Sequence, residues 1–309
     1  MTESNNIIKN KFYDVVLFHY PCQDGLSSGW IVNYFHKSYD KNIDIYPIKH
    51  GSPYDYSRLK NKKIIFCDYS PSKEVLDELE LICDEIKILD HHITALDALK
   101  DKPYAIFDME KSGAGLTWEY FYPLIEMPLF IQMVQDRDLW KWNIPDSKDF
   151  TAGLFTLWDG YDHYDFEQIF KLYDEIYLSK DKFNFCMGLG QVINKANSQK
   201  AKSIAESGCK RIDKFMGFKV CVVNCPVEHA SEVGNVLSSM DSIDFAVMWS
   251  YNNVTESYYV SLRSCNKVDV SKIAKSYGGG GHVNASGLST KIFPPVLFNN
   301  PILFNNSCS

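Results

Sequence analysis

The chain has 309 residues, 45% of them hydrophobic, and a formal net charge of −7 at pH 7. This length allows two domains with separate hydrophobic cores. The acidic balance argues against a protein that holds long duplex nucleic acid through its overall field, whereas a local cationic pocket would still suit a small anionic substrate.

Cysteine usage and hydropathy indicate the compartment. None of the nine cysteines forms a CxxC pair, and two of them, Cys67 and Cys221, lie in apolar runs typical of strands. We therefore expect buried free thiols in a reducing compartment. No stretch approaches the ~20 apolar residues of a membrane span, and the polar N-terminus has no apolar segment of signal-peptide length. These features predict a cytoplasmic protein without a membrane partner.

The first half of the chain alternates short apolar runs with helical patterns. Strands are expected over residues 15–19, 43–48, 63–68 and 86–90. Helices are expected over 26–35, 73–83, 113–121 and 129–135, and Ser70-Pro71 is typical of the N-cap and first turn of the second of these. Such alternation predicts an α/β fold with a doubly wound, mainly parallel sheet.

The second half begins without a strand pattern. Residues 151–215 are predicted as a helical connection with helices over 166–178 and 193–215, interrupted at Gly188 and Gly190. A smaller α/β domain is expected over 216–292, with strands at 219–223, 245–249 and 258–263 and helices at 230–240 and 271–276. The first domain then spans 12–150, and the Pro- and Asn-rich tail, 293–309, is predicted to be loosely packed.

Three predicted strands of the first domain end in residues that commonly bind metals. Residues 86–89 lead into Asp90-His91-His92, residues 15–18 lead into His19 with Asp24 five positions on, and residues 64–67 lead into Asp68. The carboxyl ends of parallel strands meet at one edge of a sheet, so these side chains should lie together. Carboxylates and imidazoles in such a group indicate a metal site.

The second domain carries a glycine-rich run, Gly278 to His282, after a predicted helix. Glycines let backbone N–H groups approach an anion closely, and Arg263 offers a bidentate fork for phosphate. A flexible linker is the alternative, which the flanking helix and strand disfavour. The expected substrate-binding residues are Arg263, Ser264, Gly279, Gly280, Gly281 and His282.

Together these motifs resemble those of the DHH phosphoesterase superfamily with its DHH-associated C-terminal domain, over roughly residues 14 to 290. The resemblance implies two divalent metal ions, often manganese, with magnesium or zinc as alternatives. It places His19 on one ion and Asp68 between the two, and the ligands of the other ion would be Asp24, His91 and Asp136. It also implies that His92 faces the substrate phosphate while Asp90 orients the histidines.

The first motif, His19 to Gly25, departs from the family pattern. Members usually carry two aspartates there, and the earlier one is replaced by Cys22 or Gln23. Cys22 is either a soft ligand that shifts the metal preference toward zinc or a bystander beside a weakened site. Buried cysteines are often inert, which favours the bystander.

Two acids and two tryptophans follow one another in the segment Asp136-Arg137-Asp138-Leu139-Trp140-Lys141-Trp142. Aromatic rings beside a basic residue can stack nucleobases. Tryptophans more often pack in cores or interfaces, and we expect this for Trp140 and Trp142. Asp138 is expected to be a spare acid or a salt-bridge partner of Arg137.

By resemblance, the chain is expected to be a two-metal hydrolase of phosphodiester or phosphomonoester bonds. The expected substrates are nucleotides or short oligonucleotides of roughly two to five units, and binding of duplex nucleic acid is not expected. Two alternatives stay open: a polyphosphate or pyrophosphate hydrolase, and a nucleotide-binding protein whose turnover is weakened by the change at Cys22. The oligomeric state is not predicted, and a dimer is one option.

Overall fold

The structure is a computed structural model that describes residues 11–49, 55–161, 165–215 and 217–298. It divides into two compact units, residues 1–193 and 194–309. The long helix α9, Lys180–Gly208, carries the chain from the first unit into the second.

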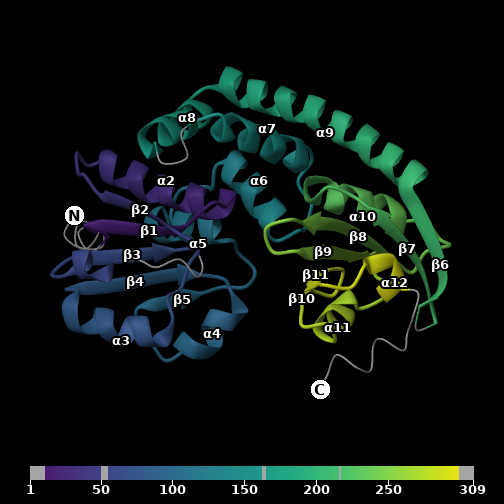
Figure 1. Cartoon of the computed structure of the whole chain (residues 1–309). Helices are drawn as coiled ribbons and strands as arrows, with labels where there is room; N and C mark the ends of the chain where they lie inside the picture. The colour runs from purple at the N-terminus through teal and green to yellow at the C-terminus, as the bar shows by residue number, and fades with distance from the viewer. Residues whose placement is uncertain (1–10, 50–54, 162–164, 216, 299–309) are drawn as a thin grey trace. The chain divides into compact units, whose positions relative to one another are not determined.

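The first unit contains a five-stranded sheet in the order β2-β1-β3-β4-β5. All four strand pairs are parallel, which confirms the predicted α/β fold and parallel sheet (Figure 1). The strands are β1 Val15–His19, β2 Asp44–Ile48, β3 Lys63–Cys67, β4 Glu85–Asp90 and β5 Ala105–Phe107. No strand was predicted at β5, which is only three residues long.

Helices cover both faces of this sheet, as the burial of successive strand residues shows. Val16 and Phe18 join a core formed with α2, α5, α6, α7 and α8, whereas Val15 and Leu17 join a core on the other face with α3 and α4. The first set comprises α2 Gln23–Lys37, α5 Gly113–Phe121, α6 Leu129–Asp138, α7 Ser147–Asp159 and α8 Phe166–Leu178, and the second comprises α3 Lys73–Ile82 and α4 Ile93–Leu99. Burial on both faces explains the continuous apolar runs of β1 and β3.

Two details of these helices differ from the prediction. The N-cap of α3 is Ser72, whose Oγ accepts a hydrogen bond from the Val75 backbone N–H at 3.4 Å, and not Ser70. The helices α7 and α8, expected to belong to a separate connection, contribute Phe150, Trp158 and Phe170 to the core of the first unit.

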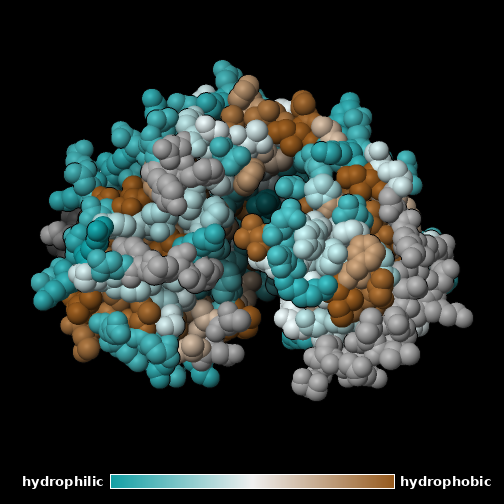
Figure 2. Space-filling model, viewed as in Figure 1, coloured by the Kyte–Doolittle hydropathy of each residue, from teal (hydrophilic) through white to brown (hydrophobic). Residues whose placement is uncertain are grey.

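The predicted interruption at Gly188 and Gly190 is wrong, because both residues lie within the continuous helix α9. A Cβ added at Gly190 would lie 1.6 Å from the Asp149 carbonyl oxygen, and one at Gly153 would lie 1.9 Å from the Cys186 carbonyl oxygen. These two glycines therefore let α7 and α9 approach closely. In the space-filling view, hydrophobic residues gather over α7 and α9 (Figure 2), where Phe155, Phe185 and Val192 are exposed.

The second unit contains a six-stranded mixed sheet in the order β10-β11-β9-β8-β7-β6, in which only β7 and β8 are parallel. Its strands are β6 Cys209–Phe215, β7 Phe218–Asn224, β8 Phe245–Asn252, β9 Ser257–Ser264, β10 Gly280–His282 and β11 Ala285–Thr290. The predicted helix over 193–215 is wrong beyond Gly208, where pairing with β7 makes the chain a strand. Tertiary pairing here decides over the local pattern.

The helices of the second unit are α10 Ala230–Ser238, α11 Val270–Lys275 and α12 Pro294–Leu297. Residues of α10 belong to one core, while those of α11 and α12 belong to another. Leu297 and Phe298 are fully buried there, so the prediction of a loosely packed tail is wrong as far as Phe298. Residues 299–309 lie outside the described residues.

Six cysteines of the described residues are free thiols, but Cys221 is disulfide-bonded, which corrects the expectation of free thiols at that position. Among the described residues, no helix has both the length and the apolar character needed to cross a bilayer.

Candidate metal centre and active site

Three strand ends meet around Asp68 at the carboxyl edge of the parallel sheet. Asp68 Oδ2 lies 3.4 Å from Nδ1 of His19, at the end of β1, and Asp68 Oδ1 lies 3.2 Å from Nε2 of His91, after β4. Asp68 itself has a left-handed backbone with φ 55°, a conformation that aspartate tolerates better than most residues. Its backbone N–H donates to the Leu89 carbonyl oxygen at 2.9 Å, which fixes this turn against β4.

Asp24 approaches the same place from the first turn of α2. Its carboxylate accepts hydrogen bonds from the backbone N–H groups of Gly113 at 2.6 Å and Ala114 at 2.9 Å, at the start of α5. Asp24 Oδ2 also lies 3.8 Å from His91 Nε2. A helix N-terminus favours a negative charge, so α5 stabilises this buried carboxylate.

Asp136, a predicted metal ligand, does not join this group. Its carboxylate accepts hydrogen bonds from the backbone N–H groups of Asn143 at 2.7 Å and Ile144 at 3.2 Å and from Ser147 Oγ at 2.6 Å. Asp136 therefore holds the loop after α6. Asp138, two residues on, lies with the other acids, and its Oδ2 is 3.5 Å from His91 Nε2. Asp138, expected to be a spare acid or a salt-bridge partner of Arg137, is thus placed beside His91.

The structure also distinguishes the two candidates for the missing aspartate of the first motif. Gln23 is buried, donates to the Thr151 carbonyl oxygen at 2.7 Å and accepts from Arg137 at 3.2 Å. Cys22, at the N-cap of α2, makes no side-chain capping hydrogen bond. Its Sγ lies with ligand atoms of His19 and Asp68, all within 4.8 Å of one another.

Asp90 orients His92. The Asp90 carboxylate accepts hydrogen bonds from His92 Nδ1 at 2.7 Å, from Ser70 Oγ at 2.5 Å and from the His91 backbone N–H at 2.7 Å. The hydrogen bond to Asp90 raises the pKa of His92 above its usual value. The His92 side chain is 42% exposed, so its ring can reach a ligand.

Three overlapping groups of ligand atoms result, each within 4.8 Å: His19, Cys22 and Asp68; Asp24, His91 and Asp138; and Asp68, His91 and His92. Burial, together with Asp138 and Asp68, raises the pKa of Asp24. Burial alone would raise the pKa of Asp68 too, but His19 and His91 bring it to about 2. Divalent cations suit such a site because they offset clustered negative charge. Asp68 Oδ2 is buried, and its nearest ionisable neighbour among the described residues is His19 Nδ1 at 3.4 Å. This environment fits a ligand atom.

A cavity of about 570 Å³ adjoins this cluster at His92. It has polar residues at Ser70 and Lys73 and apolar residues at Pro71, Ala95 and Leu99. Its remaining lining residues are Tyr69, Ser72, Asp90 and Ala98. The cavity therefore offers both polar and apolar contacts to a ligand bound at His92.

The loop held by Asp136 carries Trp140 and Trp142, both with positive φ (55° and 53°). Trp140 is 58% exposed, and the two rings meet edge to face with centroids 5.0 Å apart. Trp140 is therefore not part of the core of the first unit, and packing of the tryptophans at an interface stays a prediction.

In the second unit, Arg263 and His282 lie in one row of the sheet, because Ala285 pairs with both. Directly paired residues project to the same face. Arg263 donates to Ser231 Oγ at 3.0 Å. Ser264 Oγ accepts from the backbone N–H groups of Lys267 and Val268 at 3.3 and 3.0 Å, so it holds a turn.

The glycine-rich run is partly a hairpin strand and not an open loop. Gly280, Gly281 and His282 form β10, which pairs with β11. A Cβ at Gly279 would lie 2.2 Å from the Gly287 carbonyl oxygen, and one at Gly281 would lie 2.6 Å from that of Ala285. These two glycines are thus needed for the close approach of the two strands. His282 is exposed.

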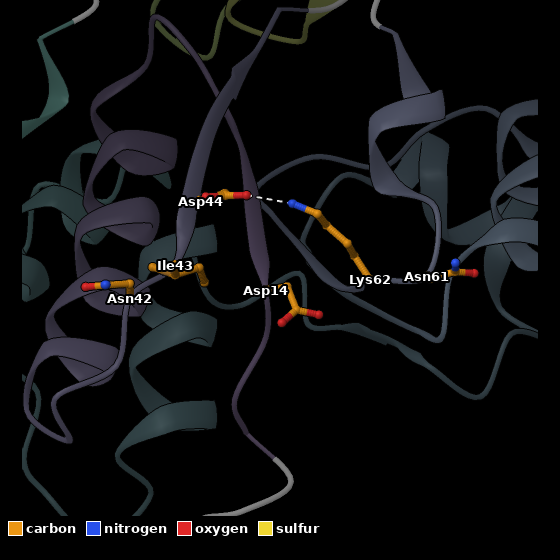
Figure 3. A pocket seen from close by; sticks show the side chains of 6 residues that line it. All are labelled: Asp14, Asn42, Ile43, Asp44, Asn61 and Lys62. Atoms are coloured by element: carbon orange, nitrogen blue, oxygen red, sulfur yellow. Dashed lines mark hydrogen bonds and ion pairs between the residues drawn. The ribbon is translucent and has the colours of Figure 1, made fainter.

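Another pocket lies at the opposite, amino edge of the first sheet, lined by Asp14, Asn42, Ile43, Asp44, Asn61 and Lys62 (Figure 3). Its Lys62 and Asp44 form an ion pair at 2.6 Å. It contains none of the predicted site residues.

Comparisons with known proteins agree with this arrangement. Residues 217–292 match the DHHA1 domain family. The chain is 33% identical over 307 residues to the uncharacterized protein R106 of Acanthamoeba polyphaga mimivirus, covering 92% of this chain and 69% of that protein. It is 26% identical over 234 residues to the oligoribonuclease NrnB of Bacillus subtilis, covering 71% of this chain and 56% of NrnB.

Two solved structures share the fold. The pGpG-specific phosphodiesterase PggH of Vibrio cholerae is 13% identical with a TM-score of 0.56, covering 95% of this chain and 99% of that one. The exonuclease RecJ bound to manganese is 14% identical with a TM-score of 0.54, covering 98% of this chain and 94% of that one.

The first unit carries acids and histidines at the carboxyl edge of its parallel sheet, and a DHHA1 domain follows it along the chain. This combination defines the class of the chain as a hydrolase of phosphoester bonds. The chain belongs to the DHH phosphoesterase superfamily.

Proposed function

We propose that this protein is a divalent-metal-dependent phosphodiesterase that hydrolyses short single-stranded oligonucleotides, down to dinucleotides. The observation that carries the proposal is the position of Asp68. One of its oxygens faces His19 and the other faces His91, at 3.4 and 3.2 Å. A single carboxylate is thus placed to belong to two metal positions, as a two-metal phosphoesterase requires.

We assign one metal position to His19 and Asp68, and the other to Asp24, Asp68, His91 and Asp138. Bound ions would supply an activated water and neutralise charge on the phosphate. The mixed nitrogen and oxygen ligands of the second position suit manganese, and the manganese bound to RecJ supports this choice.

His92 is the protein group that we assign to the scissile phosphate. Its Nδ1 is held by Asp90, which directs the opposite side of the ring, with Nε2, away from that carboxylate. Asp90 also raises the pKa of His92, so more of the imidazole is protonated at neutral pH and can donate a charge-assisted hydrogen bond. Asp90 is a positioning residue in this scheme.

The substrate class follows from the surroundings of the metal centre. Trp140, two residues from Asp138, exposes a ring on which a nucleobase can stack. The cavity beside His92 offers polar and apolar contacts for a further part of a nucleotide. Oligoribonuclease activity in NrnB and pGpG hydrolysis by PggH support short oligonucleotides.

We further propose that residues 216–292 form the substrate-binding domain. Within it, we assign a second phosphate of the substrate to Arg263 and His282, which share one row of the sheet. A guanidinium binds phosphate oxygens in a bidentate manner, and an imidazole can add a further donor. Ser264 is left out of this assignment because its hydroxyl holds a turn.

A polyphosphate hydrolase is the second candidate, because it would use the same metal centre. Polyphosphate has no base to stack on Trp140, so we favour nucleotides. The test is a comparison of turnover, with manganese, on labelled dinucleotides, long single strands, a cyclic dinucleotide and polyphosphate. Dinucleotides should be hydrolysed fastest, and Asp68→Asn should abolish the activity. Faster turnover of polyphosphate or of the long strands would overturn the proposal, and no hydrolysis at all would favour a binding protein.

A further inference from the structure

Cys22 lies where the first metal position needs another ligand. Its Sγ, an imidazole nitrogen of His19 and a carboxylate oxygen of Asp68 lie within 4.8 Å of one another. Zinc–sulfur and zinc–nitrogen bonds are about 2.3 and 2.0–2.1 Å long, so two ligand atoms of one ion lie at most about 4.4 Å apart. The three atoms are therefore near enough to converge on one ion. Among the described residues, Cys22 is the cysteine found in such a group.

Local structure directs this thiol to the cluster. Cys22 has an extended backbone, φ −148° and ψ 139°, and its side chain does not cap α2. The neighbouring Gln23 is held away by Thr151 and Arg137. The side chain at position 22 is therefore the one that replaces the missing carboxylate in space.

The two metal positions consequently differ in chemistry. Asp24, His91 and Asp138 offer one imidazole and two carboxylates, a set that suits manganese or magnesium. His19, Cys22 and Asp68 offer nitrogen, sulfur and oxygen, and a thiolate selects zinc and similar softer ions over manganese.

We propose that Cys22 is a thiolate ligand of the first metal ion. This centre then takes a zinc-class ion at His19, Cys22 and the shared Asp68, and a harder ion at Asp24, His91, Asp138 and the same Asp68. This inference rests on the proposed two-metal function. It assigns a direct role to the residue in which the first motif departs from its family.

Cobalt(II) tests the thiolate without any measurement of activity, because cobalt–thiolate bonds give an intense charge-transfer absorption in the near ultraviolet. The full chain is freed of metal with a chelator and titrated with Co2+. The parent should show the band, and Cys22→Ser should lose it. Cys265→Ser is the matched control, since Cys265 is an exposed free thiol of the second unit, and it should keep the band.

Competition between zinc and manganese gives an independent test of the thiolate ligand. Loss of a residue that only hydrogen-bonds to a metal ligand already lowers metal affinity roughly 10–100-fold. Cys22→Ser removes a proposed ligand itself, so it should weaken zinc binding at least as much. Cys22→Asp should bind manganese at both positions and lose the preference for zinc. This variant retains a ligand, so it serves if the serine variant fails to fold.

The outcomes separate this inference from the proposed function. Co2+ binding by the parent without the charge-transfer band, or a band that persists in Cys22→Ser, would overturn the thiolate assignment and leave the metal-dependent hydrolase intact. Failure of the parent to bind either Co2+ or Mn2+ would overturn both. Equal zinc affinity in the parent and in Cys22→Asp would also count against Cys22 as a ligand.

Discussion

Asp136 and Asp138 should respond in opposite ways to the same substitution, aspartate to asparagine. Asp136 accepts three hydrogen bonds that hold the loop after α6. An amide keeps one of the two oxygens, so Asp136→Asn loses at least one hydrogen bond to a charged group, about 1.5–3 kcal/mol. For a unit of this size that lowers the Tm by roughly 3–12 °C, at about 2–4 °C per kcal/mol. Metal binding should persist.

Asp138 makes its closest charged contact with His91, at 3.5 Å, and burial already raises the pKa of its carboxyl. Asp138→Asn should therefore change the Tm of the metal-free protein less than Asp136→Asn does. The two variants should differ instead in the increase in Tm that follows the addition of metal. An ion at about 100 times its Kd stabilises the fold by about 2.7 kcal/mol, or roughly 5–11 °C. A lost ligand should remove most of this gain.

The assay is thermal unfolding of the full chain, followed by tryptophan fluorescence, with and without manganese. Parent and Asp136→Asn should show the same gain in Tm on adding manganese, and Asp138→Asn should show little. Hydrolysis measured in parallel should be lost in Asp138→Asn alone. The reverse pattern, with the manganese gain lost in Asp136→Asn and kept in Asp138→Asn, would refute the reasoning and return Asp136 to the metal.

Substitutions at the other assigned residues should each affect hydrolysis in a distinct way. Asp68→Asn should reduce hydrolysis to background while the far-ultraviolet circular dichroism stays unchanged; measurable turnover would remove the bridging assignment. His92→Gln should lower kcat by roughly 10²–10⁴-fold with metal content intact, and a change in KM alone would contradict its role at the scissile phosphate. Trp140→Ala should raise KM for a dinucleotide and leave a small chromogenic diester unaffected, whereas equal effects on both would exclude stacking. Arg263→Ala and His282→Ala should behave likewise, and equal losses on both substrates would mean that these residues are structural.

The sequence was sufficient to predict that His19, Asp68 and His91 lie together. Each follows an apolar run, and a run buried on both faces of a parallel sheet has few alternatives to a strand. Because such strands share a carboxyl edge, their ends can be placed without knowledge of the side-chain contacts. Residues on strand ends were therefore predictable from pattern alone.

The choice between Asp136 and Asp138 was not predictable in this way. Two residues on a helix are about 200° apart around its axis, so only one of them can face the centre. The helix α6 buries Phe130, Ile131, Met133 and Val134, which lie on more than one side. Apolar periodicity therefore gave no indication of the face that meets the other acids.

Features set by tertiary contacts were also missed. The strand β6 depends on pairing with β7, and Gly190 lies in α9 because another helix approaches it there. Trp140 is exposed because Asp136 fixes a loop in which its φ is positive. General burial tendencies of tryptophan cannot anticipate a loop of this kind.

Gly113 shows how closely the fold and the metal centre depend on each other. Its backbone N–H donates to Asp24 at 2.6 Å, so the start of α5 must lie directly against that carboxylate. A Cβ at this position would lie 2.4 Å from Cβ of Asp68 and 2.9 Å from Oδ2 of Asp24. A side chain here would displace a proposed ligand of both metal positions or the helix that stabilises Asp24. The packing of α5 against the sheet and the assembly of the ligands are thus one structural requirement, met by the absence of a side chain.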